Sequence, residues 1–160
     1  MNADEFGPQR LVIAAFLTKE DRERIGEWSG SLQWPKDAVI KDPSTYHITV
    51  LYSQIGGDDL SVQGWINDLT PYRFDLVSTS LDIFTNPGHH PNSPIVLRFM
   101  APEMAEFVED LMEEAEGKGL HVSRFDDTYN PHVTLGFASS LPKGDQLLIS
   151  LRTTSIGVWS

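Results

Sequence analysis

The chain has 160 residues, of which 40% are hydrophobic and 22% charged, and its formal net charge is −11. This length suits one domain with a real core, and the acidic balance disfavours a bulk electrostatic grip on long nucleic acid or an anionic membrane, although a local cleft can bind a small anion. The absence of cysteine excludes disulfides, thiol catalysis and zinc–thiolate or iron–sulfur sites, and fits a reducing compartment.

We expect no targeting signal at the start of this sequence. Residues 1–10 are polar and acidic and lack the apolar stretch of a secretory signal peptide. The apolar run that follows is too short to span a bilayer. We therefore expect a soluble, cytoplasmic protein.

The first predicted elements are a strand and a capped helix. Leu11–Leu17 is a short continuous apolar run, which is typical of a buried strand. Thr18 follows as a helix N-cap, with Glu20 and Asp21 in the first turn, where carboxylates are favourable. This pattern predicts a helix that ends near Gly30.

The later elements alternate between strands and helices. Pro102 begins a helix with apolar residues at helical spacing, which runs to about Glu116 before Gly117 and Gly119 end it. Asn86–Pro94 is a loop by composition. The other predictions, in chain order, are a strand at Tyr46–Ser53, a helix at Ser61–Leu69, and strands at Tyr72–Phe84, Ile95–Met100, Leu120–Phe125, Pro131–Ala138 and Gln146–Trp159, the last of which could be broken in two.

These elements indicate the fold class. About six or seven strands and three helices in mixed order favour an α+β or mixed α/β fold with a largely antiparallel sheet. No linker is long enough to separate independent domains, so residues 1–160 are expected to form a single domain.

The helix after Pro102 is strongly acidic. Its carboxylates could bind metal, but such a run is more often a solvated helix face, and we adopt that interpretation. The acidic residues are Glu103, Glu106, Glu109, Asp110, Glu113, Glu114 and Glu116.

Two segments of the sequence share one pattern. His47–Val50 and His132–Leu135 each read His, aliphatic, Thr, aliphatic, and the histidines, like the threonines, are 85 positions apart. In a chain of this composition about 0.05 such patterns are expected by chance, so two on predicted strands are not noise.

The spacing places the histidine and the threonine of each segment together. Strand side chains alternate, so His47 shares a face with Thr49, and His132 shares a face with Thr134. The aliphatic residues, and Tyr52 with them, point to the other face and into the core. The His/Thr face then lines a wet surface, on which Gly136 would leave space.

Two such segments facing each other suit phosphoester chemistry. A neutral imidazole can take a proton from an attacking hydroxyl, and a protonated one can give a proton to the leaving oxygen. The two threonine hydroxyls can hold the non-bridging phosphate oxygens. This chemistry needs no metal and no other cofactor, and the pattern holds no carboxylate to bind a metal.

The paired motifs resemble those of the 2H phosphoesterase superfamily, and the resemblance extends from the Leu11 strand to the Trp159 strand. It implies a bilobal fold with two pseudo-symmetric β-sheet lobes, outer helices and a central cleft. It also implies that the catalytic positions are His47, Thr49, His132 and Thr134.

The resemblance is less specific about the subfamily. The superfamily includes 2'-5' RNA ligase-like proteins, cyclic nucleotide phosphodiesterases and phage anti-CBASS nucleases that degrade cyclic oligonucleotide signals. The flanks of both motifs are similar to those of the anti-CBASS group. However, the first strand has no tyrosine, and no acidic residue follows Leu147 in the C-terminal strand.

Two residues before the second motif are candidates for substrate binding. Arg124 suits a phosphate and Tyr129 suits stacking on a base. Arg124 could equally pair with Asp126 or Asp127. Other histidines, tyrosines and tryptophans are interpreted by position. His89 and His90 could bind a metal, but we interpret them as exposed loop residues because no acidic or cysteine ligands are clustered near them in the sequence. His121 is interpreted as structural, Tyr46 and Tyr52 as core, and Trp28, Trp34, Trp65 and Trp159 as anchors of the core or of a cleft rim.

The sequence therefore predicts a metal-independent phosphodiesterase that acts on a small or short ribonucleotide. Candidate linkages are a 2',3'-cyclic phosphate, a 2'-5' linkage and a cyclic oligonucleotide. Two alternatives stay open: a non-catalytic nucleotide sensor or sponge that uses the same cleft, and a protein-interaction module that uses the acidic helix. The first would bind without turnover, and the second would not need either histidine.

Overall fold

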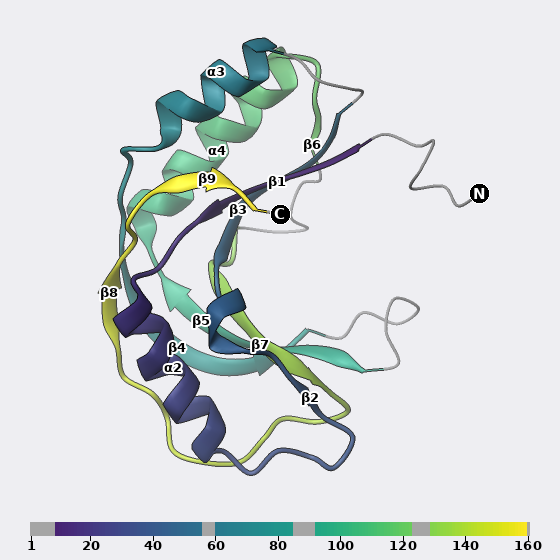
Figure 1. Ribbon diagram of the computed structural model, residues 1–160, viewed down its shortest axis with the longest axis vertical. Coiled ribbons are helices and arrows are strands. Elements are labelled where there is room, and N and C mark those ends of the chain that lie inside the picture. The colour runs from purple at the N-terminus through teal and green to yellow at the C-terminus, as the bar shows by residue number, and fades with distance from the viewer. Residues whose placement is uncertain (1–8, 56–59, 85–91, 123–128, 160) are drawn as a thin grey trace, which may run out of the picture.

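The computed structural model describes residues 9–55, 60–84, 92–122 and 129–159 (Figure 1). Within these ranges the α-helices are α2 (Lys19–Ser31), α3 (Leu60–Leu69) and α4 (Pro102–Gly117), and a 3-10 turn covers Pro43–Thr45. The strands are β1 (Gln9–Ala15), β2 (Val39–Ile40), β3 (Ile48–Ile55), β4 (Asp75–Ile83), β5 (Ser93–Met100), β6 (His121–Val122), β7 (His132–Ala138), β8 (Ser150–Arg152) and β9 (Ile156–Val158).

The strands form two antiparallel sheets, as the α+β prediction requires. One sheet has the order β6-β3-β1-β9, and the other has the order β2-β7-β5-β4-β8. In Figure 1, α3 and α4 lie at one end of the molecule and α2 lies at the other. One hydrophobic cluster includes buried side chains from both sheets. None of the helices in these ranges is long and apolar enough to cross a membrane.

The two sheets repeat one arrangement around the motif strands. Each motif strand, β3 or β7, lies between a two-residue strand and a central strand, β1 or β5, that leads into a helix. Ile13 pairs with Leu51, and Ile95 pairs with Gly136. Equivalent residues of the two central strands are therefore 82 positions apart in the sequence (13 and 95), and equivalent residues of the two motif strands are 85 positions apart (51 and 136). The internal repeat extends beyond the two motifs to the β-strand and helix before each.

Each motif strand carries a bulge at the same place. The pairing of β3 with β1 skips Val50, and the pairing of β7 with β5 skips Leu135. A bulge inserts one residue, so the alternation of faces reverses beyond it. Val50 and Leu51 are both buried, as are Leu135 and Gly136, while Tyr52 is half-buried. The prediction that Tyr52 points to the core with Val50 is therefore wrong.

Gly136 also differs from its prediction. It is buried, and a Cβ added to it would lie 2.5 Å from the carbonyl oxygen of Val39 and 3.4 Å from the ring of Trp34. Glycine therefore permits the close approach of β2 rather than leaving space in a wet surface.

The helices follow their local signals closely. Thr18 caps α2, where its hydroxyl accepts a hydrogen bond of 3.0 Å from the backbone N–H of Asp21. The apolar face of α4 is buried, and it includes Met104 and Val108. All seven acidic residues predicted on a solvated face of this helix are exposed.

The remaining differences between the predicted and the observed strands arise from pairing with residues that are distant in the sequence. The strand predicted at Tyr72–Phe84 begins at Asp75, and the one predicted at Gln146–Trp159 is divided into β8 and β9. Before β8, the backbone of Ile149 bonds to Ser78, whose hydroxyl also donates to the carbonyl of Leu147. Of the strand predicted at Leu120–Phe125, only β6 falls within the described residues. The short exposed strand β2 has no counterpart in the predictions.

Candidate active site

The structure confirms which faces the motif residues occupy before the bulges. His47, Thr49, His132 and Thr134 are all partly exposed. The aliphatic residues between and after them are completely buried: Ile48, Val50, Val133 and Leu135. The polar members of both motifs are thus held on a surface by strands whose apolar side chains are fixed in the core.

The tertiary structure brings the two motifs together. The hydroxyl of Tyr129, three residues before His132, donates a hydrogen bond of 2.6 Å to the backbone carbonyl of Thr49. Strands β3 and β7 are also in contact. Burial lowers the pKa of His132, and the charge of His47 adds to this effect.

Both imidazoles are oriented in the same way. Nδ1 of His47 lies 2.9 Å from the carbonyl oxygen of Thr45, and Nδ1 of His132 lies 2.7 Å from that of Asn130. A carbonyl oxygen only accepts, so Nδ1 must carry the proton in each bond. Nε2 is therefore the nitrogen that is left to take up or release a proton, as acid–base catalysis requires.

Each imidazole also contacts one aromatic ring, from the residue that follows a strand of its own sheet. His47 is stacked on Trp159 with ring centroids 3.9 Å apart, and His132 meets Phe84 edge-to-face at 4.9 Å. The two aromatic residues hold equivalent positions. The N–H of Trp159 donates to the carbonyl of Val12, and that of Phe84 donates to Pro94, again 82 positions along (12 to 94). The repeat therefore includes the ring that packs on each histidine.

The surroundings of both imidazoles favour their neutral forms. Burial lowers the pKa of both His47 and His132, and the hydrogen bonds to the carbonyls of Thr45 and Asn130 oppose it. The charge of Lys41 further lowers the pKa of His47. An anion bound between the histidines would act in the opposite direction and favour their protonated forms.

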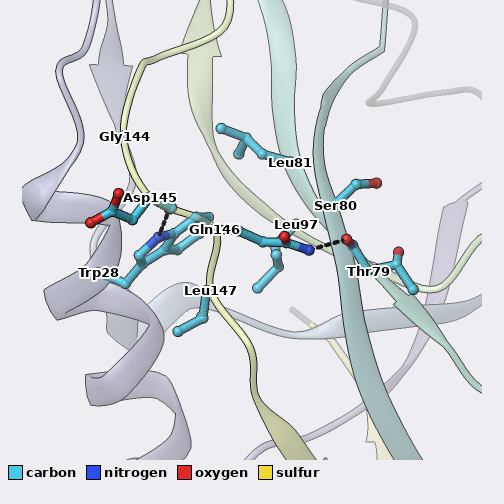
Figure 2. Close-up of a pocket in the computed structure, with 9 residues that line it drawn as sticks. All are labelled: Trp28, Thr79, Ser80, Leu81, Leu97, Gly144, Asp145, Gln146 and Leu147. Atoms are coloured by element: carbon cyan, nitrogen blue, oxygen red, sulfur yellow. Dashed lines mark hydrogen bonds between the residues drawn. The ribbon is translucent and has the colours of Figure 1, made fainter.

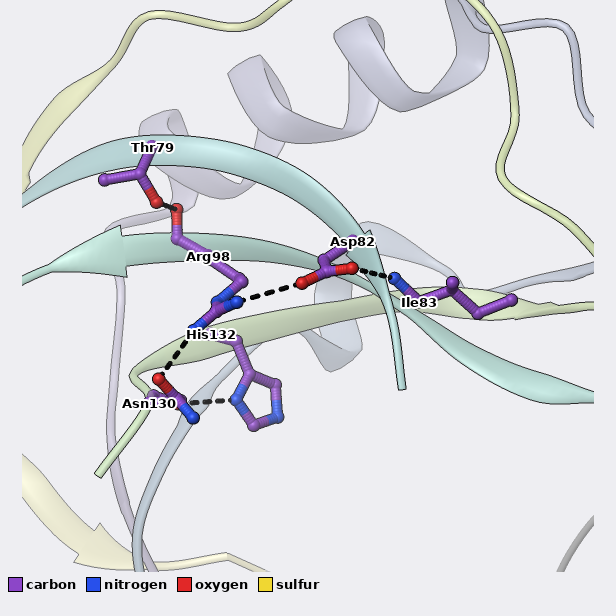
Figure 3. A network of polar contacts seen from close by, with 6 residues as sticks. All are labelled: Thr79, Asp82, Ile83, Arg98, Asn130 and His132. Carbon is purple, nitrogen blue, oxygen red and sulfur yellow. Dashed lines mark hydrogen bonds and ion pairs between the residues drawn. The ribbon is translucent and has the colours of Figure 1, made fainter. Parts of the chain in front are cut away.

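Arg98 is a site residue that the sequence reasoning missed. It pairs with His132 across β5 and β7, and its charge contributes to lowering the pKa of that histidine. Figure 3 shows its guanidinium between Asp82 Oδ2, at 2.9 Å, and Asn130 Oδ1, at 2.7 Å. The backbone carbonyl of Asn130 in turn orients His132. The sequence feature that could have identified Arg98 is that it is a single charged residue within the otherwise apolar run of β5.

The two histidines differ at this position. The register that pairs Arg98 with His132 places Phe16 at the corresponding site beside His47, since 16 and 98 are 82 positions apart. Phe16 contacts Trp159, with ring centroids 6.4 Å apart. His132 thus has a charged, hydrogen-bonded neighbour where His47 has an aromatic one.

Tyr129 does not hold its predicted role. Its side chain is only 7% exposed, and its hydroxyl is bonded to Thr49. Burial also raises the pKa of its phenol. A ring in this position is not open to stacking on a base, so that prediction is wrong. Its contact instead ties the first motif to the second.

The other predicted residues are distributed as follows. Arg124, His89 and His90 lie outside the described residues, as does the alternative pairing of Arg124. His121, which was predicted to be structural, is exposed on β6. Tyr46 is a core residue, as expected.

A separate cavity of about 290 Å³ lies between α2 and β4, and Trp28 is one of the residues that line it. Figure 2 shows Trp28 at one wall and Leu81 at the other. The Trp28 Nε1–H donates to the carbonyl of Asp145 at 2.7 Å, and Gln146 donates to that of Thr79 at 2.8 Å. No motif residue lines this cavity, so it is distinct from the candidate active site.

Comparisons with known proteins place this geometry in a structural context. Neither the protein-family models nor the curated proteins contain a match to the chain. Among solved structures, the chain is similar to Escherichia coli LigT complexed with 3'-AMP, with a TM-score of 0.64 and 18% identity over 93% of this chain and 86% of that one.

Two further solved structures give the same result. The protein TT0787 of Thermus thermophilus has a TM-score of 0.61 and 20% identity over 90% of this chain and 82% of that one. A structure described as a phosphoesterase has a TM-score of 0.60 and 22% identity over 93% and 86%. These likenesses confirm the predicted architecture: the chain shares its bilobal α+β fold with LigT, TT0787 and the structure described as a phosphoesterase.

Proposed function

We propose that this protein is a metal-independent phosphodiesterase that cleaves a ribonucleotide phosphodiester by acid–base catalysis with two histidines. One observation carries the proposal. His47 and His132 are anchored alike through Nδ1, which leaves Nε2 for proton transfer, and each lies on one strand face with a threonine. The similarity of the fold to LigT and to a phosphoesterase supports a phosphoesterase-type enzyme.

The proposed reaction uses each motif once. In a transesterification the attacking oxygen is the free ribose hydroxyl next to the phosphodiester, which is the 2'-hydroxyl for a 3'-linked phosphate and the 3'-hydroxyl for a 2'-5' linkage. In the hydrolysis of a cyclic phosphate it is water. Nε2 of one histidine takes its proton as the new P–O bond forms, and Nε2 of the other gives a proton to the leaving oxygen as the old bond breaks. The hydroxyls of Thr49 and Thr134 donate to the non-bridging oxygens. The two histidines exchange roles when the direction reverses.

Arg98 is proposed as a positioning residue for His132. Its guanidinium holds Asn130, whose backbone carbonyl fixes the Nδ1–H of His132. Its charge also favours the neutral imidazole before substrate binds. Arg98 therefore acts through the orientation and protonation of the histidine, while the chemistry belongs to the imidazole.

The substrate is proposed to be small or short. A net charge of −11 opposes long nucleic acid. Solved structures of LigT, which shares the fold, contain 3'-AMP and NADP+, a mononucleotide and a dinucleotide. We include 2',3'-cyclic phosphates, 2'-5' linkages and cyclic oligonucleotides in the class. The last would fit an anti-CBASS nuclease acting in the cytoplasm.

The test is a substrate panel in EDTA, resolved by chromatography. It contains 2',3'-cyclic nucleotides, a 2'-5' oligoadenylate, and cyclic di- and trinucleotides. Each is incubated with the wild type, with His47→Ala, with His132→Ala, and with His121→Ala as a control for loss of an exposed histidine outside the motifs.

We expect turnover of at least one member, lost by orders of magnitude in both motif variants and retained in the control. Turnover that survives in both motif variants would refute two-histidine catalysis. Tight binding without turnover of any member would replace the enzyme with a nucleotide sensor or sponge.

A further inference from the structure

A groove runs between α3 and α4, and we call it the α3–α4 groove. It has a volume of about 380 Å³, and none of the four motif residues lines it. Figure 1 shows the two helices beside each other at one end of the molecule. The lining residues are Trp65, Asp68, Leu69 and Tyr72 from the α3 side, and Phe107, Asp110, Leu111 and Glu114 from α4.

Aromatic rings form much of the wall of this groove. Tyr72 and Phe107 are in contact at one end, with ring centroids 5.0 Å apart, and Phe107 is backed by Phe74 at 4.9 Å. At the other end, the Trp65 Nε1–H donates to Glu114 Oε2 at 2.9 Å, which holds the indole in place. Tyr72 is 49% exposed, so the aromatic wall is accessible to a ligand.

The charged side chains that line the groove are all acidic, while one cation, the ammonium of Lys118, lies beside the groove over Trp65. Asp68, Asp110 and Glu114 are exposed, and among the described residues no lysine, arginine or histidine lines the groove. Aromatic faces attract cations through the negative charge of the ring face. The protein already shows this contact, since the ammonium of Lys118 lies over Trp65 at 5.7 Å from the ring centroid. The aromatic rings and the carboxylates of the groove together favour a cation as its ligand.

The spread of the carboxylates argues for an extended cation over a metal ion. Within the part of the chain that the structure describes, no three acidic or histidine side chains are placed to hold a metal. Asp110 and Glu114 are one turn of α4 apart, about 6 Å along the helix, and Phe107 to Glu114 spans about 10 Å. Apolar side chains, Leu69 and Leu111, lie among these charges.

We propose that the α3–α4 groove binds a linear polyamine, that is, primary or secondary ammonium groups joined by short methylene chains. The ammonium groups would pair with the carboxylates and lie against the rings, while the methylenes cover the leucines and Phe107. This proposal is independent of the proposed catalytic function, because it concerns residues and a readout that the catalytic motifs do not share.

The test measures binding of spermidine by calorimetry, at low and at physiological salt. The wild type is compared with a double variant, Asp110→Asn with Glu114→Gln, which removes two groove charges and keeps an acceptor for Trp65. The matched control is Glu103→Gln with Glu106→Gln, which removes two exposed charges from the same helix outside the groove. Circular dichroism and thermal melts verify that all variants are folded.

We expect the groove variant to bind spermidine about tenfold more weakly than the wild type and the control to bind it within about twofold. An equal loss in both variants would show general attraction to an acidic protein and overturn the proposal, as would no binding by the wild type.

Two competitors complete the test. Equal competition by Mg²⁺ would overturn the proposal, because a point cation cannot use the aromatic wall. A lysine-rich peptide that binds the groove much more tightly than spermidine would also overturn it, because the occupant would then be a protein segment.

Discussion

Replacing Tyr129 by phenylalanine tests whether this residue ties the two motifs together or receives substrate. The side chain is only 7% exposed, and its hydroxyl donates a 2.6 Å hydrogen bond to the carbonyl of Thr49. Tyr129→Phe keeps the ring in the core and removes this donor alone. The change therefore separates the hydrogen bond from the packing.

The structure sets the expected magnitude. A typical intramolecular hydrogen bond contributes about 1 kcal/mol, and leaving a buried partner unsatisfied costs about 1–3 kcal/mol. We expect Tyr129→Phe to lower the free energy of unfolding by about 1.5 kcal/mol. For a chain of this size that corresponds to a fall in Tm of about 3–6 °C. Turnover should also fall, because Thr49 lies on the strand that the hydroxyl holds.

The assay is a thermal and urea denaturation series with a matched control. Tyr72→Phe removes the hydroxyl of a tyrosine that is 49% exposed, and it should leave Tm unchanged within about 1 °C. If Tyr129→Phe is as stable as the wild type while KM for a nucleotide rises, the hydroxyl contacts substrate and the reasoning from burial is refuted.

Three further predictions follow from the site and its supports. Arg98→Ala should lower kcat about tenfold with little change in KM. Because removing the cation raises the pKa of His132, it should also move the limb of the pH–rate profile that reports His132 to higher pH, which is the acid limb if His132 is the base and the basic limb if it is the acid; Arg98→Lys should restore part of both effects, and an unchanged profile would exclude a positioning role. Gly136→Ala should destabilise the protein by about 2 kcal/mol in urea melts, because the added Cβ would lie 2.5 Å from the Val39 carbonyl, whereas Gly30→Ala, with nothing within 4 Å, should not; equal stabilities would contradict the close approach of β2. The pKa of both motif histidines is lowered from 6.5, so the unfolded chain binds more protons than the folded chain just below that value, and stability should fall as the pH drops below about 7. Replacing both histidines by asparagine should flatten this dependence, and an unchanged slope would show that other groups cause it.

Much of the local structure and the core of the candidate site could be predicted from the sequence. Thr18 and the carboxylates after it mark the start of α2, and helical spacing after Pro102 marks α4, because caps and periodicity act within a few residues. The two motifs identify His47 and His132, since strand alternation alone puts each beside its threonine.

The local sequence pattern could not predict the register between neighbouring strands. The bulges at Val50 and Leu135 reverse the alternation, so Tyr52 leaves the core face and Gly136 enters a tight contact with β2. Whether a residue is skipped depends on the partner strand, which lies far away in the sequence.

The sequence by itself determined the strand faces before the bulges, the helix boundaries and the two histidines that we propose as acid and base. Only the tertiary structure decided which residues surround them. It buried Tyr129 against Thr49, and it brought Arg98 beside His132 from a strand more than thirty residues earlier. The physical reason is range. Alternation, capping and helical period are properties of adjacent residues, whereas burial, charge and orientation at a site depend on which distant strands pair.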